Sequence, residues 1–461
     1  MSSLASLTID GYRGFADEQT INFAVPNGGF GSGLTMIVGP NNAGKSSIIE
    51  SLHAVSRQSQ AVSISEGKRN HAAGDRVVFT IVNSEGGMKR LATVSGAGSE
   101  TAWGDNQSTE PTQDRFFIVP SRRSFNPFFG KGIANRQAYM SSYNLPPQRG
   151  TPLQFSNRLF EIQKEPDAFN ALLGRILDPV PTWYIDQNEA GQFYLKVKSG
   201  DQYHNSDGLG EGIISAMFIV DSLYDSAEGD IIVIDEPELS LHPALQRRLS
   251  PVLADYAKSR QIIYATHSPY FVNWKAIVAG AAVVRVRQKD NRSVVHHLSP
   301  AAKERVRGII SDRNNPHVLG LDASEAFFVD DKIVLVEGQE DVIFYARIMD
   351  QLRSHLPATF FGWGVGGASK MRTITSILHD LGYEKIVGIL DGDKTQEAER
   401  LTQDFPEYKF CTIPAPDVRT KPARRATDEV RGLIDEEGIV RSEYRTGVQQ
   451  IFEDLTGWLS N

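Results

Sequence analysis

The chain has 461 residues, of which 40% are hydrophobic and 23% charged, and its formal net charge is −8. This length favours two or three domains. The charge argues against a uniformly basic protein that coats DNA, although an acidic protein can still carry a local basic groove. No apolar run approaches the ~20 residues of a membrane-spanning helix, and the N-terminus lacks the pattern of a secretion signal. The single cysteine, Cys411, allows no internal disulfide, so a reducing cytoplasm is the expected location.

The first chemical motif in the chain is Gly-Pro-Asn-Asn-Ala-Gly-Lys-Ser-Ser at Gly39–Ser47. It matches the phosphate-loop pattern G-x-x-x-x-G-K-[ST], and it lies between a predicted buried strand, Leu34–Val38, and a predicted helix. Backbone N–H groups and the positive helix end can surround the β- and γ-phosphates, while the lysine adds a charge and the serine hydroxyl ligates Mg²⁺. We therefore predict that the chain binds ATP with Mg²⁺. The predicted nucleotide contacts are Gly39, Asn41, Asn42, Ala43, Gly44, Lys45, Ser46 and Ser47, with Ser46 also a metal ligand.

Two basic segments near this motif leave alternatives open. Tyr12 and Arg13 lie in a loop between two predicted strands, where they either approach the nucleotide or belong to an exposed turn. Arg122 and Arg123 follow a predicted buried strand, and they either meet a phosphate or lie exposed to solvent. The spacing of the residues does not decide between these roles.

The middle of the chain changes character twice. Residues 96–114 are rich in Gly, Ser and Thr, which predicts a loop, and residues from about 135 to 180 show a mostly helical pattern that predicts an inserted lobe. Ser206 and Gly208 then precede the apolar helical run Ile213–Leu223. A Ser-x-Gly turn at a helix N-terminus can offer N–H donors and a hydroxyl to a phosphate. A plain helix cap is the commoner explanation, so the position of this turn upstream of the next motif is what makes it a candidate nucleotide contact.

Two carboxylates follow an apolar strand further along. Asp235 and Glu236 come directly after Ile231–Ile234, and ligand groups gather at the C-terminal ends of buried parallel strands. Asp235 is expected to hold Mg²⁺ through its hydration shell, and Glu236 to orient or deprotonate the attacking water. His267 ends the next predicted strand, where it either senses the γ-phosphate or has a structural role.

Together these features resemble the ABC-type ATPase fold of recombination and chromosome-maintenance proteins. The resemblance implies that two copies meet head to tail and that the signature motif of one closes over the nucleotide held by the other. The signature does not follow the usual Leu-Ser-Gly-Gly-Gln, and we find no clear Q-loop glutamine. The matched motifs are Gly39–Ser46 as Walker A, Asp235-Glu236 as Walker B, Ser206-Asp207-Gly208 as the signature, Ser240-Leu241-His242 as the D-loop and His267 as the switch histidine.

The C-terminal part of the chain repeats the pattern of carboxylates at strand ends. Glu337 follows the predicted strand Lys332–Val336, and Asp391 and Asp393 follow Lys385–Leu390. The segments alternate as β, α and β. Carboxylates on adjacent parallel strands repel one another unless cations neutralise them. Oxygen ligands in this arrangement suit Mg²⁺ or Mn²⁺, which could activate water against a phosphodiester; the alternative is a plain acidic turn.

This half resembles a Toprim domain, which is marked by a glutamate after one strand and an Asp-x-Asp after a later one. An ABC-type ATPase followed by such a domain resembles the OLD (overcoming lysogenization defect) family of ATP-dependent nucleases, which includes the nuclease subunit of Gabija anti-phage systems. The resemblance implies a further metal position at Asp341. It also implies a late acidic residue, which we cannot place, and a lysine for which Lys421 is the candidate. The basic cluster Arg419–Arg425 is the expected DNA contact of this half.

The sequence thus predicts an α/β protein with two parts, an ABC-type ATPase domain at 1–330 with its helical insertion and a small Toprim-like domain at 331–461. Two functions stay open. One is an ATP-regulated, metal-dependent DNA endonuclease or nickase of phage defence. The other is a regulatory ATPase, as in PARIS-like systems, that holds and releases a separate effector. The expected partners are a head-to-tail second copy, DNA, and a separate effector or helicase protein, with no membrane. The predicted catalytic residues are Glu236, His267, Glu337, Asp391 and Asp393; the predicted metal ligands are Ser46, Asp235, Glu337, Asp341, Asp391 and Asp393.

Overall fold

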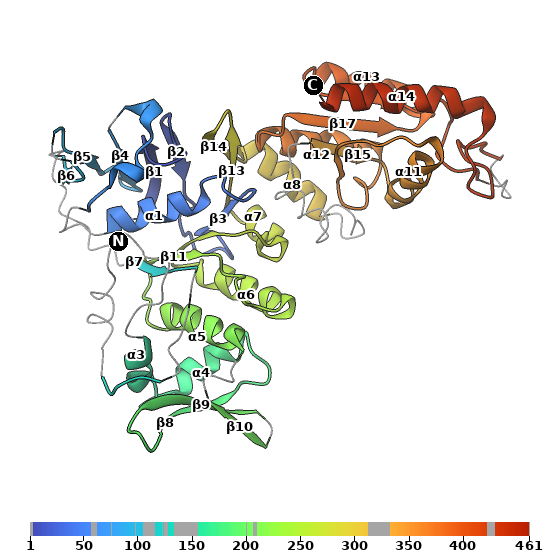
Figure 1. Cartoon of the computed structure of the whole chain (residues 1–461). Helices are drawn as coiled ribbons and strands as arrows, with labels where there is room; N and C mark the ends of the chain where they lie inside the picture. Colours follow the sequence, from blue (N-terminus) through green and yellow to red (C-terminus); the bar gives the residue numbers. More distant parts are fainter. Residues whose placement is uncertain are drawn as a thin grey trace. The chain divides into compact units, whose positions relative to one another are not determined.

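The structure is a computed structural model, and it describes residues 3–56, 62–74, 76–96, 98–104, 116–121, 123, 128–132, 155–199, 201–205, 210–311, 332–421 and 429–460. The chain forms two compact units, Met1–Val295 and His296–Asn461 (Figure 1), and each is described on its own. The expected domain boundary at 331 lies outside the described residues, so the domain limits stay a prediction. Within the described residues, no helix is both long and apolar enough to cross a membrane.

A mostly parallel sheet forms the centre of the N-terminal unit. Its strands β7, β11, β12, β3 and β13 run parallel in that order, and β14 lies at the edge beside β13. The central strands are buried along their whole length, as expected for a parallel sheet covered on both faces. Their bounds are β3 (Leu34–Val38), β7 (Phe116–Val119), β11 (Ile231–Asp235), β12 (Gln261–Ala265), β13 (Ala282–Lys289) and β14 (Arg292–His297).

A second, antiparallel sheet belongs to the same unit, with the strand order β2-β1-β4-β5-β6. Strands β4 and β5 form an antiparallel hairpin around residue 86. The loop expected at 96–114 is wrong in one part, because Thr101–Trp103 pairs with β5 as a short edge strand. The bounds are β1 (Leu4–Asp10), β2 (Gln19–Asn22), β4 (Val78–Asn83), β5 (Met88–Thr93) and β6 (Thr101–Trp103).

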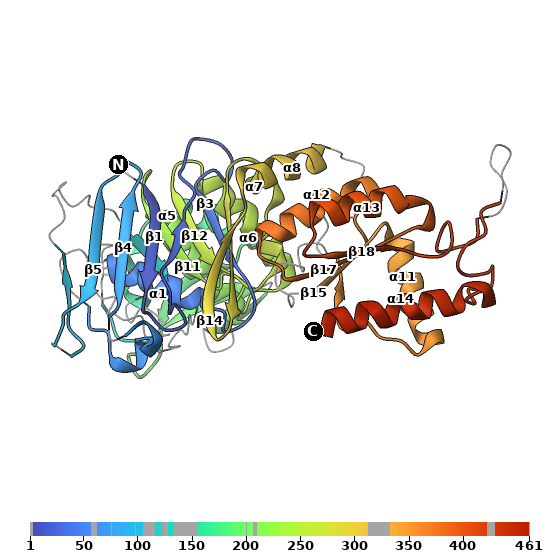
Figure 2. The ribbon, with the colours of Figure 1, turned by 90° about the horizontal axis from the view of Figure 1, so that it is seen from above.

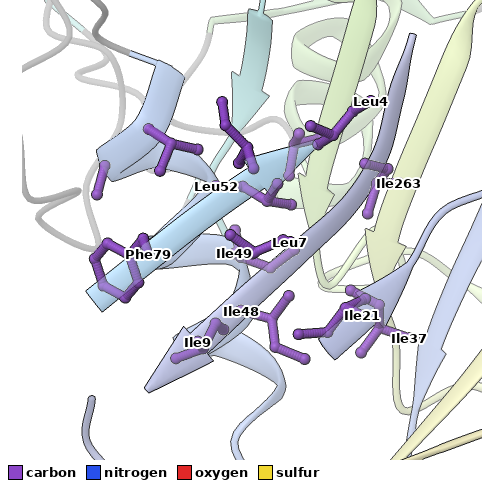
Figure 3. Close-up of a cluster of buried hydrophobic side chains, with 14 of the residues drawn as sticks. Leu4, Leu7, Ile9, Ile21, Ile37, Ile48, Ile49, Leu52, Phe79 and Ile263 are labelled. Carbon is purple, nitrogen blue, oxygen red and sulfur yellow. The ribbon is translucent and has the colours of Figure 1, made fainter. Parts of the chain in front are cut away.

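Helix α1 (Lys45–Ser56) packs between the two sheets and forms the core of the unit (Figure 3). Ile48, Leu52 and Val55 recur at helical spacing and are fully buried. They meet apolar side chains from both sheets, such as Leu7 and Ile263. Burying each such side chain stabilises the fold by roughly 1.5–3 kcal/mol. This packing fixes the helix that carries the phosphate loop.

The other face of the parallel sheet is covered by α5 (Glu211–Tyr224) and α6 (Pro243–Tyr256). A lobe follows β7 in the chain and includes a small antiparallel sheet of order β10-β9-β8. The predicted helical insertion is described only from residue 155 onward, where it contains two short helices. The lobe elements are α3 (Phe155–Ile162), α4 (Asp167–Leu173), β8 (Thr182–Gln187), β9 (Phe193–Ser199) and β10 (Gln202–Asn205), while η1 (Glu66–Lys68), η2 (His71–Ala73), η3 (Pro269–Phe271) and α7 (Trp274–Val278) lie outside it.

The C-terminal unit has a parallel sheet of order β16-β15-β17-β18. Helices α11 and α14 cover one face and share a core with β15 and β17, and α12 and α13 cover the other (Figure 2). The predicted βαβ alternation is confirmed. The bounds are α8 (Pro300–Ser311), β15 (Lys332–Val336), α11 (Gln339–Leu352), β16 (Thr359–Phe360), α12 (Ala368–Asp380), β17 (Lys385–Leu390), η4 (Gly392–Lys394), α13 (Thr395–Asp404), β18 (Lys409–Thr412) and α14 (Ser442–Ser460).

Candidate functional site

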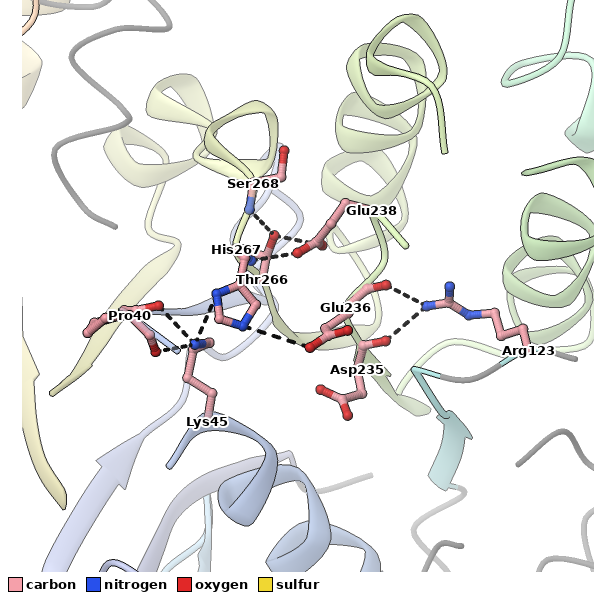
Figure 4. A network of polar contacts seen from close by, with 10 residues as sticks. Pro40, Lys45, Arg123, Asp235, Glu236, Glu238, Thr266, His267 and Ser268 are labelled. Carbon is pink, nitrogen blue, oxygen red and sulfur yellow. Dashed lines mark hydrogen bonds and ion pairs between the residues drawn. The ribbon is translucent and has the colours of Figure 1, made fainter. Parts of the chain in front are cut away.

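The phosphate loop joins β3 to α1, as the sequence predicts. The Lys45 side chain is 5% exposed and bends back over the loop, where its ammonium donates to the carbonyls of Gly39 and Pro40, each at 2.8 Å. Burial lowers the pKa of Lys45 to about 8, against Glu236, Glu238 and Asp235, which raise it. The lysine is therefore held inside the loop, beside the carboxylates of β11 (Figure 4).

Two residues of β13 and β14 hold the loop in shape. Ser293 donates its hydroxyl to the carbonyl of Ala43 at 2.7 Å, and Gln288 donates to the carbonyl of Asn42 at 3.0 Å. Gly39 has a φ of +138°, and a Cβ there would lie 2.0 Å from the carbonyl oxygen of Val286. Only glycine fits this close approach of loop and strand. The loop is thus fixed by β13 and β14 as well as by its own helix.

The predicted Walker B pair lies at the C-terminal end of β11. Asp235 is 9% exposed, and burial together with Glu236 raises its pKa to about 7, while Arg123 and Ser121 lower it. Its Oδ1 atom is buried and has no hydrogen-bond partner among the described residues. A buried carboxylate oxygen without a partner fits a group that ligates the hydration shell of Mg²⁺.

Glu236 adopts a left-handed backbone conformation, with a φ of +50°, which costs a residue other than glycine about 1 kcal/mol or more. Its N–H donates to the carbonyl of Ala265 at 2.8 Å. Its carboxylate lies 3.8 Å from Nε2 of His267, at the end of β12. Burial, reinforced by the charge of Lys45, lowers the pKa of His267 to about 4, so the imidazole is neutral at pH 7 and can accept or donate a hydrogen bond.

Glu238 anchors the end of β12. It accepts hydrogen bonds from the Thr266 hydroxyl at 2.8 Å and from the backbone N–H of His267 at 2.5 Å. Burial raises the pKa of Glu238, and these hydrogen bonds oppose the rise. The Nδ1 atom of His267 is 3.4 Å from the Lys45 ammonium. Lys45, Asp235, Glu236 and His267 are thus brought together, while Glu238 and Thr266, to which the sequence analysis gave no role, position the histidine (Figure 4).

Arg123 is buried beside the backbone of Asp235 and Glu236. It is 9% exposed, and its guanidinium donates to the carbonyls of Asp235 at 2.9 Å and Glu236 at 2.7 Å, and to the Ser215 hydroxyl at 2.8 Å. Burial lowers its pKa to about 10, so it stays charged at neutral pH. The expectation of an exposed arginine is wrong for Arg123, and that of a phosphate contact stays a prediction, whereas Arg122 lies outside the described residues.

The loop at Tyr12 and Arg13 contacts the phosphate-loop helix. The Tyr12 hydroxyl and the Arg13 guanidinium both bind the carboxylate of Glu50, at 2.6 and 2.8 Å. Burial and the negative charge of Glu50 raise the pKa of Tyr12 well above its ordinary value. Ser206 and Gly208, the expected signature contacts, lie outside the described residues, and Ser240 of the expected D-loop donates its hydroxyl to Glu211 at 3.0 Å.

The second group of carboxylates lies at the C-terminal ends of β15, β17 and β18. The carbonyl of Glu337 accepts from the N–H groups of Gly366 and Gly367, at 2.9 and 2.8 Å. Its side chain accepts from the backbone N–H of Asp391 at 3.1 Å. Neighbouring parallel strands therefore bring Glu337 and Asp391 together, as the sequence predicts.

Asp417 is the member of this group that the sequence analysis did not identify. It is 9% exposed and accepts from the ammonium of Lys421 and, at 3.1 Å, from the N–H of Arg419. Burial, with Glu337, Asp417 and Asp341, raises the pKa of Asp391 to about 8, and Lys421 opposes the rise. The sequence gives no clear signal for it, because Asp417 follows a short and only partly buried strand, Lys409–Thr412, whose pairing with β17 brings it to the group.

Asp341 and Asp393 differ in their surroundings. Asp341 caps α11 by accepting from the N–H of Gly338 at 2.8 Å, and burial, with Glu337 and Asp417, raises its pKa to about 6. The side chain of Asp393 is 55% exposed and pairs with Lys394 at 2.8 Å. The structure thus groups Asp341 with the other carboxylates and turns Asp393 to solvent beside a lysine. Of the basic cluster, Arg419 and Lys421 are described and 422–428 lie outside the described residues.

The chemistry of these donors fits a hard divalent cation, because burial and the charges of Glu337 and Asp417 raise the pKa values of Asp391 and Asp341, and oxygen ligands suit Mg²⁺ or Mn²⁺. Within the described ranges, however, no three His, Cys, Asp or Glu side chains are already gathered as a metal site. Lys421 occupies a carboxylate oxygen of Asp417. Holding an ion would thus require these side chains to turn toward it.

Two protein-family models match the N-terminal part of the chain. One, described as "AAA domain", matches residues 6–108. The other, described as "AAA domain, putative AbiEii toxin, Type IV TA system", matches residues 114–273. Together with the phosphate loop and the parallel sheet, they establish a P-loop ATPase domain in an α/β protein.

Two curated proteins are similar in sequence. One is OLD nuclease of Thermus scotoductus, 30% identical over 176 residues, which are 36% of this chain and 32% of that protein. The other is Endonuclease GajA of Bacillus cereus, 24% identical over 198 residues, which are 42% of this chain and 32% of that protein. The alignments span about a third of each relative. They confirm the resemblance to the OLD family, and they do not distinguish the PARIS-like alternative.

Solved structures that align with parts of the chain include heads of SMC proteins. The SMC head domain of Thermotoga maritima aligns with a TM-score of 0.39 and 15% identity over 64% of this chain and 99% of that chain. A Pyrococcus furiosus SMC head with an extended coiled coil, bound to the C-terminal domain of ScpA, aligns with a TM-score of 0.43 and 13% identity. The alignment covers 68% of this chain and 100% of that chain.

Proposed function

From the similarity of this chain to OLD nuclease and Endonuclease GajA, we propose that it is an ATP-regulated, metal-dependent DNA endonuclease or nickase of phage defence. One observation carries the proposal. The chain combines a P-loop site with a second set of strand-end carboxylates, in which Glu337, Asp391 and Asp417 couple electrostatically beside Lys421. Structural carboxylates normally have basic partners, whereas carboxylates that repel one another suit a cation-binding site.

The first site would hydrolyse ATP. Backbone N–H groups of 39–47 and the Lys45 ammonium would hold the phosphates, and Ser46 and Asp235 would hold Mg²⁺. The bound ion would neutralise charge on the phosphates. Glu236 would orient and deprotonate the attacking water, and the neutral imidazole of His267 would hydrogen-bond toward the terminal phosphate. Lys45 would leave the loop carbonyls for the phosphates, which are stronger acceptors.

The second site would cut the phosphodiester. Glu337, Asp391 and Asp417 would hold Mg²⁺ or Mn²⁺, and the ion would supply an activated water there. Lys421 would pass from Asp417 to the substrate phosphate once the ion is bound, because both the ion and the lysine compete for the same carboxylate oxygen. Asp341 would keep its capping role and contribute negative charge. Asp393 would lie at the solvent-exposed edge of the acidic site.

The assembly and its surroundings complete the proposal. A second copy would meet the first head to tail, with Ser206 and Gly208 of one subunit on the nucleotide of the other. DNA would be the substrate of the C-terminal unit, and a helicase-type protein would be a further partner. We place the protein in the cytoplasm, which agrees with its single cysteine.

A second candidate function is an ATPase sensor that restrains a separate effector and cuts no DNA. It is favoured by the state of the acidic site. Within the described residues no ready metal group is assembled, and Asp393 and Asp417 are each engaged by a lysine. In this function the C-terminal unit would bind the effector and perform no chemistry.

One experiment separates the two candidates. The purified protein is incubated with supercoiled and linear DNA, with Mg²⁺ or Mn²⁺, and with or without ATP. We expect nicked or linear product from the wild type and a loss of at least about 100-fold in Glu337→Ala. ATP hydrolysis should persist in that variant, because Glu337 belongs to the other unit.

The control is Glu399→Ala, an exposed glutamate on α13 of the same unit. It should cut DNA as the wild type does. Absence of cleavage by the wild type under every condition would favour the sensor function. Cleavage that persists in Glu337→Ala would place the nuclease site elsewhere.

A further inference from the structure

In the first site, Arg123 connects the end of β11 to α5. It comes from the end of β7, the strand next to β11 in the sheet. Its side chain is 9% exposed. It donates to the two backbone carbonyls of Asp235 and Glu236. Its contacts are with the backbone that carries the catalytic carboxylates.

The backbone that Arg123 holds is the strained one. Glu236 has a φ of +50°, a conformation that persists in a residue other than glycine only where its surroundings impose it. The N–H of Glu236 binds Ala265 of β12, and both carbonyls of the turn bind the guanidinium of Arg123. Hydrogen bonds donated by a charged group are stronger than hydrogen bonds between neutral groups. Arg123 therefore helps to set the direction in which the Glu236 side chain leaves the turn.

The third contact of Arg123 reaches α5. Its guanidinium donates to the Ser215 hydroxyl at 2.8 Å, and that hydroxyl donates to the carbonyl of Leu239 at 3.1 Å. The first turn of α5 also lies against Ser240, since a Cβ on Gly212 would be 2.7 Å from the carbonyl oxygen of Ser240. The start of α5 thus contacts 235–236 through Arg123 and 239–240 directly.

We propose that Arg123 is a positioning residue for ATP hydrolysis, which holds Glu236 in its catalytic direction and ties that direction to the position of α5 through Ser215. The inference rests on the proposed ATPase function and adds its regulation. A shift of the first turn of α5 moves Ser215, and the shared guanidinium transmits the shift to the turn of Glu236. Since α5 follows residues 206–208, a second subunit that contacts those residues would act on hydrolysis through this connection.

The test separates nucleotide binding from hydrolysis. Arg123→Met keeps much of the side-chain volume and removes all three donors. We expect ATP affinity and KM to change less than about threefold and kcat to fall about 10- to 100-fold, since a misplacement near 1 Å costs a reaction about 10²-fold. Arg123→Lys, which keeps the charge and fewer donors, should fall between the wild type and Arg123→Met. Ser215→Ala should lower kcat severalfold at an unchanged KM.

The control is Arg175→Met. Arg175 pairs with Asp255 of α6 at 2.9 Å and belongs neither to α5 nor to the phosphate site. This variant should leave kcat and KM as they are. A folded Arg123→Met with wild-type kcat would overturn the inference, as would an equal loss in Arg175→Met. If Arg123→Met does not fold, Ser215→Ala decides, and an unchanged kcat there overturns it.

Hydrogen exchange gives a readout that does not depend on activity. In the wild type, ATP with Mg²⁺ should slow amide exchange at 211–215 and at 235–240 together. In Arg123→Met, the nucleotide should protect the phosphate loop and leave 211–215 as in the free protein. Equal protection of both segments in the variant would exclude the connection. A wild type that binds no ATP, or whose hydrolysis survives Glu236→Gln, would instead refute the proposed ATPase site.

Discussion

The two units place carboxylates at the C-terminal ends of parallel strands in the same way, but they surround them differently. In the N-terminal unit, backbone and side-chain donors fix the acidic residues. Glu238 accepts two hydrogen bonds, and Arg123 holds the turn of Asp235 and Glu236. In the C-terminal unit, Asp391 faces other carboxylates, and its pKa rises to about 8.

The difference indicates when each site is complete. In the first site, groups of the chain itself hold the backbone turn of Asp235 and Glu236 and the carboxylate of Glu238. In the second site, the carboxylates around Asp391 repel one another, and Lys421 partly offsets this repulsion. A divalent cation would relieve that repulsion. We therefore expect the activity of the first site to depend on its internal hydrogen bonds. The stability and activity of the second site should depend on a bound cation and on pH.

The largest expected effect is on the first site. Glu236→Gln keeps the shape of the side chain and removes its basicity, so kcat for ATP should fall by about 10²- to 10⁴-fold. ATP binding should be retained, because Lys45 and the loop N–H groups are unchanged. Hydrolysis is measured by phosphate release and binding by a fluorescent ATP analogue. Light scattering should show larger particles for the variant with ATP than without it.

A strictly monomeric Glu236→Gln with ATP bound would contradict the head-to-tail assembly. Wild-type hydrolysis in the variant would mean that a different group activates water. Asp17→Asn serves as the control, since Asp17 is exposed and pairs with Arg292 at the surface.

The next effect contrasts two aspartates of the second site. Asp417→Asn removes a carboxylate that couples to Asp391 and holds Lys421, so DNA cleavage should fall by about 100-fold or more. Asp393→Asn changes an exposed side chain beside Lys394, and we expect a fall of less than about tenfold. Both are measured with the same supercoiled substrate, with phosphate release as the check that the ATPase is intact. A larger loss of cleavage in Asp393→Asn than in Asp417→Asn would mean that Asp393, and not Asp417, belongs to the metal site.

The sequence predicts those parts of the sites whose residues are close together in the chain. The phosphate loop has its strand and helix within a few residues, and Asp235 and Glu236 directly follow an apolar strand. Local pattern is enough there, because the fixed geometry of a strand, loop and helix is set by neighbours in the chain. The roles assigned to these residues nevertheless stay predictions.

The residues that the sequence misses depend on strand order. Arg123 reaches Glu236 across 113 positions of the chain, and it does so only because β7 lies beside β11. Asp417 joins Glu337 and Asp391 only because β18 lies beside β17. Its strand, Lys409–Thr412, is short and only partly buried, so it lacks the apolar run that marks the other strands. A pattern in one segment carries no information on its neighbour in the sheet.

A smaller effect tests the hydrogen bonds of the first site. Thr266 is fully buried, and Thr266→Val removes its hydrogen bond to the Glu238 carboxylate at nearly constant volume. Losing a hydrogen bond to a charged group costs about 1.5–3 kcal/mol, which lowers the melting temperature by several degrees in a unit of this size. Differential scanning calorimetry without nucleotide measures it. Thr8→Val, at an exposed hydrogen bond to Thr20, is the control and should change the melting temperature little.

The smallest effect concerns the charge of the second site. The pKa of Asp391 is about 8 in the folded chain and about 3.9 in an unfolded one. Between these values the folded state keeps a proton that the unfolded state has released, so the free energy of unfolding decreases as pH rises from about 4 to 8. Without divalent ions, the melting temperature of the C-terminal unit should therefore be lower at pH 8 than at pH 5.

Adding Mg²⁺ at pH 8 should reverse this loss, because the ion replaces the proton between the carboxylates. Asp391→Asn has no proton to release, so its melting temperature should depend less on pH and respond less to Mg²⁺. Asp393→Asn should behave as the wild type does, since its side chain is exposed and paired with Lys394. If the wild-type melting temperature changes with neither pH nor Mg²⁺, the acidic residues at these strand ends do not form a cation site. The two units would then not differ in their dependence on a bound cation.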